Sequence, residues 1–310
     1  MLIDAITQYC NDEYHCLKES NTECRNCNHK IVNGLKCPDY LKSCKTCFKE
    51  IHYPQDYPNG KKDYDCYPII DFYTCCYAFK YASEMLYLYR CSDLLDDITM
   101  CNVFSIGCGA CPDLMALEQY DKDEGITRKI NYWGLDYNNR WKHVHSKISE
   151  YCSVVNIETN FIYEDVIRYF EQYKIENTNV LVLEYVISSM INSGEIDRNH
   201  IDRFYRMLIE KIVLNRNTEV PFIIFINDVN HYAKGRDDFM KLHWILKNDY
   251  QINSVPFAFY FDYNINNEGK KFGDMHEANN LLFRVPVNFN YYSPWLNCSS
   301  AQFMIEIDKE

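Results

Sequence analysis

Two glycines and an aspartate in the middle of the chain have the types and spacing needed to hold a nucleotide. Gly107 and Gly109 follow an apolar run at 102–106, and Asp136 ends a second run at 130–136. Glycine has no Cβ, so its backbone turns sharply and lets a ligand approach closely. A carboxylate that ends the second strand can accept hydrogen bonds from ribose hydroxyls. The pattern of strand, Gly-x-Gly turn, helix, strand and acid predicts the first half of a nucleotide-binding α/β sheet.

The residues after this turn separate the classes of nucleotide. Pro112 stands where a dinucleotide fingerprint carries its third glycine. Proline suits the first turn of a helix but does not allow the same close approach of helix and strand. No lysine follows in a Walker pattern, which excludes a P-loop. What remains resembles motif I of class I S-adenosylmethionine (SAM) methyltransferases.

This resemblance covers residues 102–308 and implies roles for the turn. The loop from Ser105 to Cys111 would wrap the methionine part of SAM, and Asp136 would hold its ribose. The motif usually has an acid where Ser105 stands and often a third glycine where Cys111 stands. Asp113, in the first turn of the next helix, could supply part of the missing negative charge near the sulfonium.

Apolar runs and amphipathic stretches alternate through the rest of the chain. Runs at 161–165, 179–186 and 221–228 predict strands, and stretches at 141–151, 166–173, 201–214 and 239–246 predict helices. This alternation predicts a doubly wound, mostly parallel α/β sheet. Runs at 283–289 and 301–307 predict a closing hairpin, similar to the antiparallel last strand of class I methyltransferases. Pro286 indicates that the first of these runs is a strand at a sheet edge or one that begins near that residue.

A helical pattern at 69–90 comes before the glycine turn. Tyr73, Tyr77, Tyr81 and Glu84 recur four residues apart, so they share one stripe of the helix. The simpler interpretation is a helix packed on the sheet. The alternative is a lid over SAM, because tyrosine offers a flat apolar face and a hydroxyl. In some small-molecule N-methyltransferases tyrosines from such a helix cover the cofactor, and the similarity is one of arrangement only.

Ligands of such sheets bind beyond the carboxyl ends of the strands. Glu164 and Asp165 follow the third strand, where this family usually contacts adenine, and Glu184 and Tyr185 follow the fourth. We expect Glu184 or Tyr185 to orient the methyl acceptor or to take its proton. The predicted cofactor-binding residues are Ser105, Gly107, Cys108, Gly109, Asp113, Asp136, Tyr137, Glu164, Asp165, Tyr77 and Tyr81.

The amino-terminal part of the chain is rich in cysteine. Cys24-x-x-Cys27 and Cys44-x-x-Cys47 are separated by 16 residues, the spacing of a four-thiolate zinc site. No signal peptide is visible, so we expect a cytoplasmic protein with reduced thiols, which favours metal over disulfides. Candidates for a second zinc are Cys10, Cys16, His29, Cys37 and His52.

We divide the chain into three parts. Residues 1–62 form a cysteine-rich zinc-binding module and linker, 63–100 a helical lid or connector, and 101–310 a Rossmann-like methyltransferase domain. A module of that size cannot build a large core alone, so metal binding would supply its folding free energy. The usual task of such a module is to hold a partner, here a possible protein partner.

Composition restricts the partners further. The chain of 310 residues has 32 basic and 44 acidic residues and a net charge of −12, which disfavours binding to nucleic acid phosphates. No apolar run is long enough to span a membrane. Two functions stay open: a methyltransferase acting on a small molecule or on a protein or RNA group, and a non-catalytic, zinc-stabilised protein-interaction scaffold with a degenerate methyltransferase fold.

Overall fold

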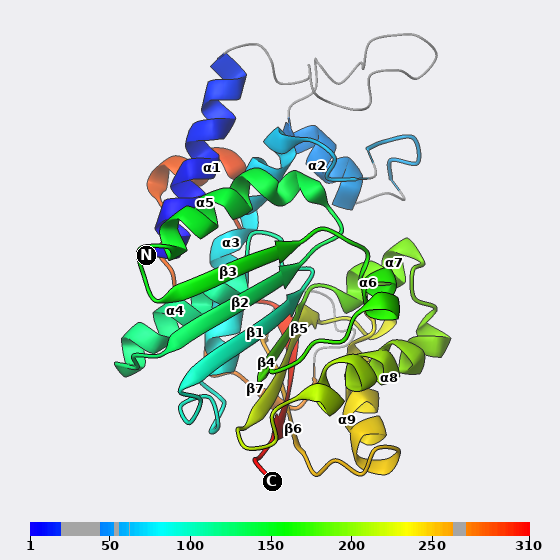
Figure 1. The fold of residues 1–310 in the computed structure, drawn as a ribbon. Helices are drawn as coiled ribbons and strands as arrows, with labels where there is room; N and C mark the ends of the chain where they lie inside the picture. Colours follow the sequence, from blue (N-terminus) through cyan, green and yellow to red (C-terminus); the bar gives the residue numbers. More distant parts are fainter. Residues whose placement is uncertain (20–43, 53–55, 62, 263–270) are drawn as a thin grey trace.

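The computed structural model describes residues 1–19, 44–52, 56–61, 63–262 and 271–310. Within them, eight strands form one sheet in the order β3-β2-β1-β4-β5-β8-β6-β7, with helices on both faces (Figure 1). The predicted α/β class with a mostly parallel sheet is confirmed. Cys24 and Cys27 of the predicted zinc site, with His29 and Cys37, lie outside the described residues.

The first five strands are parallel. They are β1 (Met100–Ile106), β2 (Lys129–Leu135), β3 (Ile157–Ile162), β4 (Val180–Glu184) and β5 (Phe222–Val229). Every residue of β4 is buried, as a strand covered on both faces requires. β1 lies between β2 and β4, so the chain order reverses there and the carboxyl ends of these strands form a crevice.

The far side of the sheet is antiparallel. β8 (Ser300–Ile307) runs antiparallel to both β5 and β6 (Val255–Tyr260), and β7 (Asp274–Met275) adds two residues beside β6. The antiparallel last strand is therefore confirmed, but the predicted partner strand at 283–289 is wrong. A 3-10 helix, Val287–Tyr292, occupies part of that segment instead.

The error has two parts: the run at 283–289 is not a strand, and β6 pairs with β8 in its place. A proline is involved in each part. Pro286 immediately precedes the 3-10 helix, and Val287 is 83% exposed, so this run does not present a strand face to the core. Pro256 lies inside β6 opposite Ile305, whereas β7 pairs only with Phe259 and Tyr260. The missing N–H of Pro256 therefore falls where the described strands leave the outer edge of β6 unpaired, which a proline tolerates.

The third strand also differs from its prediction at 161–165. It begins at Ile157 and pairs with β2 alone among the described strands. Glu158 and Asn160 lie on its exposed side, so the run is not apolar throughout and its first half was missed. The strand ends at Ile162, so Glu164 and Asp165, which the predicted run included, lie in the segment that follows it.

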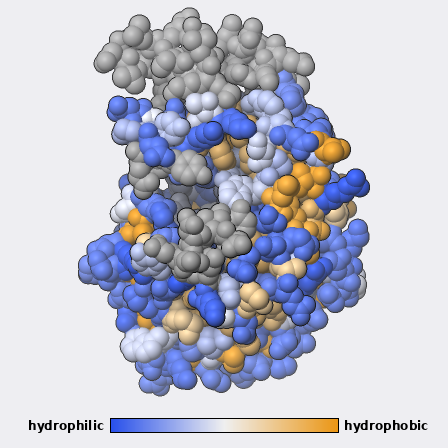
Figure 2. Space-filling view, turned by 180° about the vertical axis from the view of Figure 1, so that it is seen from behind, coloured by the Kyte–Doolittle hydropathy of each residue, from blue (hydrophilic) through white to orange (hydrophobic). Residues whose placement is uncertain are grey.

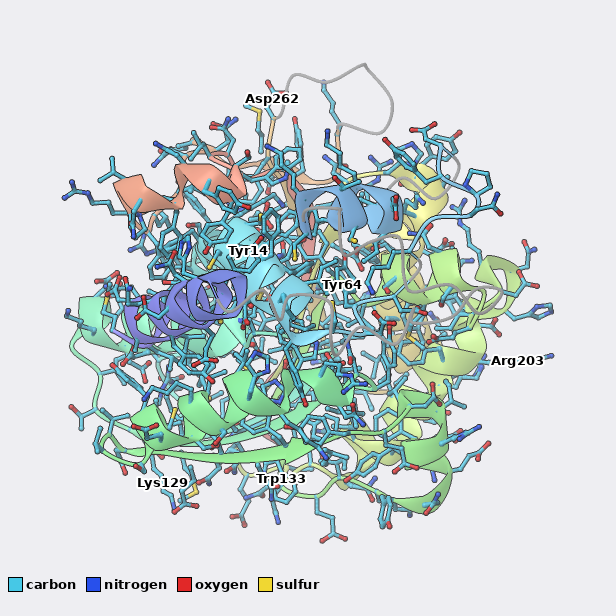
Figure 3. All side chains as sticks on the ribbon, turned by 90° about the horizontal axis from the view of Figure 1, so that it is seen from above. Tyr14, Tyr64, Lys129, Trp133, Arg203 and Asp262 are labelled. Atoms are coloured by element: carbon cyan, nitrogen blue, oxygen red, sulfur yellow. The ribbon has the colours of Figure 1, made fainter. Side chains whose placement is uncertain are left out.

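Helices cover the sheet in two layers with separate cores. One face carries α1 (Leu2–Glu19), α3 (Tyr67–Tyr89), α4 (Pro112–Glu124) and α5 (Lys142–Cys152). The other carries α6 (Val166–Gln172), α7 (Ile187–Ser193), α8 (Ile201–Lys211) and α9 (Phe239–Asn248). In the view of Figure 3, Tyr14 lies among the helices of the first layer and Trp133 points outward from the sheet.

Helix α3 lies at the centre of the first layer. Nearly all of its 23 residues are buried, which is typical of a helix surrounded by other elements. Leu2, Ile6, Cys10 and Tyr14 of α1 belong to the same hydrophobic core. Helix α2 (Cys44–His52) also packs on α3 through Phe48, whose ring centroid is 5.5 Å from that of Tyr77. The division at residue 62 stays a prediction.

The surface is mostly polar on the side that Figure 2 shows, where hydrophobic areas form separate patches. In the described part of the chain, a helix both long and apolar enough to pass through a membrane is not found.

Candidate active site

A cavity of about 190 Å³ opens at the carboxyl ends of β1, β2 and β4. Gly107, Gly109, Asp136, Glu184 and Tyr185 are among its lining residues. A second cavity, of about 40 Å³, shares both glycines, Glu184 and Tyr185 and extends toward α3. The sequence-predicted glycine turn, acid and strand-four residues therefore meet at the point where the strand order reverses, as expected for a ligand site in this fold.

A larger hollow of about 510 Å³ lies elsewhere, over the face of β1, β2 and β3 beside α6. Its lining residues include Asn102, Asn131, Glu158 and Lys174. It contains neither the glycine turn nor a carboxyl end of β1 or β4, so we place the candidate site in the smaller pair of cavities.

The glycine turn needs its glycines for two different reasons. Gly107 has φ +67°, and a Cβ there would come within 2.4 Å of Cγ2 of Val186. Gly109 has φ +48°, and a Cβ there would meet only ordinary contacts, so backbone conformation alone favours glycine. Cys111 closes the turn, with its N–H donating to the carbonyl oxygen of Cys108 at 2.7 Å.

Asp136 links the turn to β2. Its Oδ2 accepts a hydrogen bond from the Gly109 N–H at 3.1 Å, and its Oδ1 accepts one from the Asn138 N–H at 2.8 Å. Burial raises the pKa of the carboxyl to about 6, opposed by these two hydrogen bonds. Each carboxylate oxygen can accept a further hydrogen bond, so Asp136 keeps the capacity to bind hydroxyl groups.

His145 of α5 supports the same turn and was missed in the sequence. Its Nε2 lies 2.7 Å from the carbonyl oxygen of Gly109, so that nitrogen donates, and Nδ1 then accepts from the Tyr163 hydroxyl at 2.9 Å. Its ring stacks on Phe161 with centroids 4.0 Å apart. Burial lowers the pKa of His145 to about 4, so the ring is neutral. Nothing local in 141–151 marks this histidine, because its partners come from other elements.

His145 also lies near two thiols. Its nearer ring nitrogen and the sulfurs of Cys108 and Cys111 are all within 4.8 Å of one another. Among the described residues, these three side chains form the one group whose thiol and imidazole atoms lie close enough together to bind a soft metal. However, both ring nitrogens already have hydrogen-bond partners. The observation supports a metal only weakly.

Several predicted cofactor-binding residues line the 190 Å³ cavity of the candidate site, and others do not. Tyr137, Glu164 and Asp165 line it, and Asp165 also caps α6 by accepting from the Arg168 N–H at 3.0 Å. Tyr81 lines the smaller cavity and Cys108 does as well. The predicted residues that line neither cavity are Ser105, Asp113 and Tyr77.

Asp113 lies behind the turn rather than beside a cavity. It accepts a hydrogen bond at 2.9 Å from the hydroxyl of Tyr132 on β2, and burial raises its pKa to about 6. Tyr77 instead stacks between His52 and Tyr81, with centroid distances of 5.6 and 5.0 Å. Of the tyrosine stripe, Tyr73 and Tyr81 are the members that reach the cavities.

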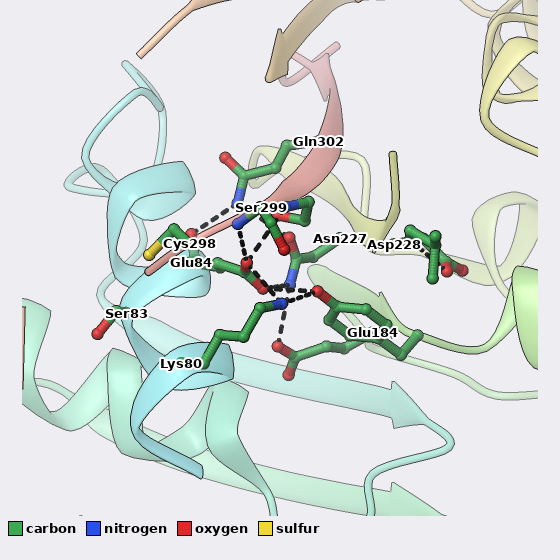
Figure 4. Close-up of polar contacts among 12 residues, drawn as sticks. Lys80, Ser83, Glu84, Glu184, Asn227, Asp228, Cys298, Ser299 and Gln302 are labelled. Carbon is green, nitrogen blue, oxygen red and sulfur yellow. Dashed lines mark hydrogen bonds and ion pairs between the residues drawn. The ribbon is translucent and has the colours of Figure 1, made fainter. Parts of the chain in front are cut away.

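A buried ion pair from α3, formed by Lys80 and Glu84 (Figure 4), holds Tyr185. Its hydroxyl donates to Oε2 of Glu84 at 2.9 Å and accepts a hydrogen bond from Nζ of Lys80. Lys80 and Glu84 are themselves 2.8 Å apart and almost completely buried. Tyr185 has φ +55°, a strained conformation that persists only where surrounding contacts fix it. The ion pair therefore fixes both the ring and the hydroxyl of Tyr185.

Glu84 connects α3 to the antiparallel side of the sheet. Its Oε1 accepts the N–H of Ser299 at 2.7 Å, and Asn227 of β5 donates to Oε2 at 3.3 Å. Gln302 of β8 donates to the Glu84 carbonyl oxygen at 2.7 Å and to Oδ1 of Asn227 at 3.0 Å. This network gives the site a rigid floor assembled from α3, β4, β5 and β8.

Glu184 has one satisfied and one unsatisfied oxygen. Oε1 accepts from Nδ2 of Asn227 at 3.1 Å, whereas the buried Oε2 has no hydrogen-bond partner among the described residues. Glu184 is 7% exposed. Burial, together with Asp113 and Glu84, raises the pKa of Glu184 well above its usual range.

Replacing Glu184 by glutamine is expected to stabilise the ligand-free protein by about 1–3 kcal/mol at pH 8, because an unsatisfied buried carboxylate is costly. The folded-state pKa is raised, so ionisation penalises the folded state as pH rises. The gain should vanish below about pH 4, where the unfolded chain is also protonated, and grow through neutral pH. Urea unfolding from pH 4 to pH 8 measures it, and a variant less stable than wild type at pH 8 would contradict the assigned burial.

Comparisons with known proteins do not identify a family for this chain. No protein-family model matches the chain, and no curated protein matches it. Solved structures give partial likeness. The plantazolicin methyltransferase BpumL in complex with S-adenosylhomocysteine (SAH) is 12% identical, covering 97% of this chain and 100% of that one, at a TM-score of 0.41.

Two further structures are similar at the same level. A proposed class I SAM-dependent methyltransferase from Listeria monocytogenes is 9% identical over 99% of this chain and 88% of its own, at a TM-score of 0.47. An rRNA methylase from Streptococcus thermophilus is 14% identical over 70% and 93%, at a TM-score of 0.35. Because all three scores are below 0.5, function has to be argued from the residues of the site.

Proposed function

We propose that this protein is a SAM-dependent methyltransferase. The observation that carries the proposal is the buried carboxylate of Asp136, hydrogen-bonded to the Gly109 N–H beside a cavity at the reversal of strand order. A carboxylate at that place suits the two hydroxyls of a ribose. The glycine turn beside it lets a ligand lie against the backbone, since a side chain at Gly107 would collide with Val186.

The residues around the cavities fit the parts of SAM. Asp136 would hold the ribose, with Tyr137, Glu164 and Asp165 around the adenine in the larger cavity. The smaller cavity, between the glycine turn and Tyr81, would take the methionine part. When bound, SAM supplies a methyl group activated by its positively charged sulfur.

The catalytic task of the protein is then mainly positioning. The acceptor must lie in line with the methyl group in a site that excludes water. Glu184 and Tyr185 line both cavities and therefore lie where the acceptor would meet the methyl group. We assign proton acceptance to Glu184 and orientation of the acceptor to Tyr185, whose hydroxyl is fixed by Lys80 and Glu84. The acceptor is a small molecule or a protein or RNA group.

The test separates this enzyme from a binding scaffold. Full-length protein is purified, denatured and analysed by mass spectrometry for SAM and SAH, and the native protein is titrated with both. A methyltransferase should bind at least one of them at one site per chain. A protein that neither carries nor binds either compound would be the zinc-stabilised interaction scaffold instead.

A zinc site at Cys24, Cys27, Cys44 and Cys47 belongs to the same proposal. Its support is the paired Cys-x-x-Cys spacing and the position of Cys44 and Cys47 on α2, where residues three apart share one face. The module would hold α2 and be available to a protein partner. Reduced thiols of this kind fit a cytoplasmic location.

Metal analysis of the purified protein should therefore find about one zinc per chain. The double variant Cys44→Ser/Cys47→Ser is expected to lose it and to unfold at lower temperature, because zinc binding supplies folding free energy. Cys91→Ser, a half-buried cysteine outside both pairs, is the matched control and should retain the metal. Zinc that persists in the double variant but disappears in Cys108→Ser/Cys111→Ser would move the site to the glycine turn.

A further inference from the structure

We infer that the methyl acceptor is an amine whose nitrogen donates a hydrogen bond to Oε2 of Glu184. This inference rests on the proposed function and names its substrate class. A buried carboxylate oxygen without a partner is costly and calls for a donor. Oε2 is such an atom, and the Glu184 side chain lines both cavities.

The charges around Glu184 favour a cationic or N–H-bearing ligand. Lys80 is the one cation in the described network with Glu84 and Glu184, so the three side chains sum to one negative charge when ionised. Asp113 adds to the negative potential, since it raises the pKa of Glu184. A protonated amine would neutralise this excess. A carboxylate acceptor would increase it, and a hydroxyl would leave it unchanged.

Three tyrosine rings form aromatic walls of the two cavities. The rings of Tyr81 and Tyr185 stack at a centroid distance of 4.1 Å, and Tyr73 lines both cavities. Nζ of Lys80 already lies 4.9 Å from the Tyr81 centroid and 4.8 Å from the Tyr185 centroid. The faces of these two rings therefore already attract Lys80, and the remaining ring, Tyr73, is the one that a cationic ligand in the cavities would meet.

The reaction balances with groups already named. The bound protonated amine would first pass one N–H proton to Oε2 of the Glu184 carboxylate. The lone pair freed in this way would then attack the methyl carbon of SAM and form the N–C bond. The carbon–sulfur bond breaks and its electron pair stays on sulfur, which leaves neutral SAH. The methylated amine would keep one positive charge, and the proton taken before the attack would stay on Glu184 until the product leaves. A base with a raised pKa is suited to this step.

Sinefungin is the probe that tests the inference. In this analogue of SAM, a carbon bearing an amine replaces the sulfur and its methyl group, so the amine occupies the position of the transferred methyl. Calorimetry on full-length wild type should find sinefungin bound at least about tenfold more tightly than SAH. Glu184→Gln should reduce this preference, taken as the ratio of sinefungin to SAH affinity in the same variant, to below about threefold.

The controls separate three results. Glu171→Gln removes the same charge from the exposed side of α6 and should retain the full sinefungin preference. Binding of SAH without a sinefungin preference in wild type, or a preference that survives in Glu184→Gln, overturns the amine assignment alone. Failure of SAH itself to bind wild type overturns the proposed function as well.

Discussion

Replacing Asp136 by alanine is expected to weaken SAM binding by at least about tenfold, measured by calorimetry on the full-length protein. The carboxylate has two tasks, because it would bind the ribose and already accepts the N–H groups of Gly109 and Asn138. Hydrogen bonds to a charged group contribute about 1.5–3 kcal/mol each. The loss of one hydrogen bond between the Asp136 carboxylate and the ligand is therefore enough to weaken binding about tenfold.

Asp228 provides the matched control. It is a buried aspartate near the end of β5 whose pKa burial also raises to about 6, and its Oδ2 accepts the Ser188 N–H at 3.0 Å. It does not line either cavity. Asp228→Ala should therefore lower stability but keep SAM affinity within about threefold. Equal losses of affinity in both variants would show that Asp136 acts only through the fold.

Replacing Lys80 by methionine is expected to destabilise the protein by about 3–5 kcal/mol, because it leaves Glu84 buried without its cation. The side chains of Lys80 and Glu84 are 5% and 0% exposed, so water cannot replace the lost partner. Urea unfolding of the ligand-free protein measures the loss. The double variant Lys80→Met/Glu84→Gln should recover a large part of it, since the buried charge is removed with its partner.

An exposed ion pair serves as the control for the buried pair of Lys80 and Glu84. Arg90 and Asp123 are 2.8 Å apart, but their side chains are 40% and 32% exposed. Arg90→Met should cost about 0–1 kcal/mol. If Lys80→Met costs no more than Arg90→Met, the network that fixes Tyr185 is not closed to solvent as described, and the assigned role of Tyr185 fails with it.

The parallel half of the fold could be predicted because its signals are local. β4 is an apolar run buried on both faces, and the glycine turn sits between β1 and α4 in a fixed order along the chain. The antiparallel side could not be predicted in the same way. Pro256 in β6 and Pro286 before the 3-10 helix carry the same local signal, and only the edge position of Pro256 makes a strand possible there.

Part of the site was predictable for the same reason. Glu184 ends a recognisable strand, Asp136 and Tyr185 directly follow one, and the fold brings all three to one cavity. Lys80 was missed, because its partner Tyr185 is 105 residues away and the contact depends on how α3 packs across the sheet.

Cysteine was the least informative residue type. Cys10 was a candidate for a second zinc from its position in a cysteine-rich segment. In the structure it lies fully buried on α1 in the core that α1 shares with α3. Free cysteine packs in cores as a small apolar side chain, and sequence spacing alone does not separate this role from that of a metal ligand.

The central claim is that the cavity at the ends of β1, β2 and β4 binds SAM, and titration of the full-length protein with SAH tests it most directly. We expect one site per chain with a dissociation constant on the order of micromolar, a free energy of about −8 kcal/mol. Absence of binding at millimolar SAH, in protein shown to be folded, would contradict the account.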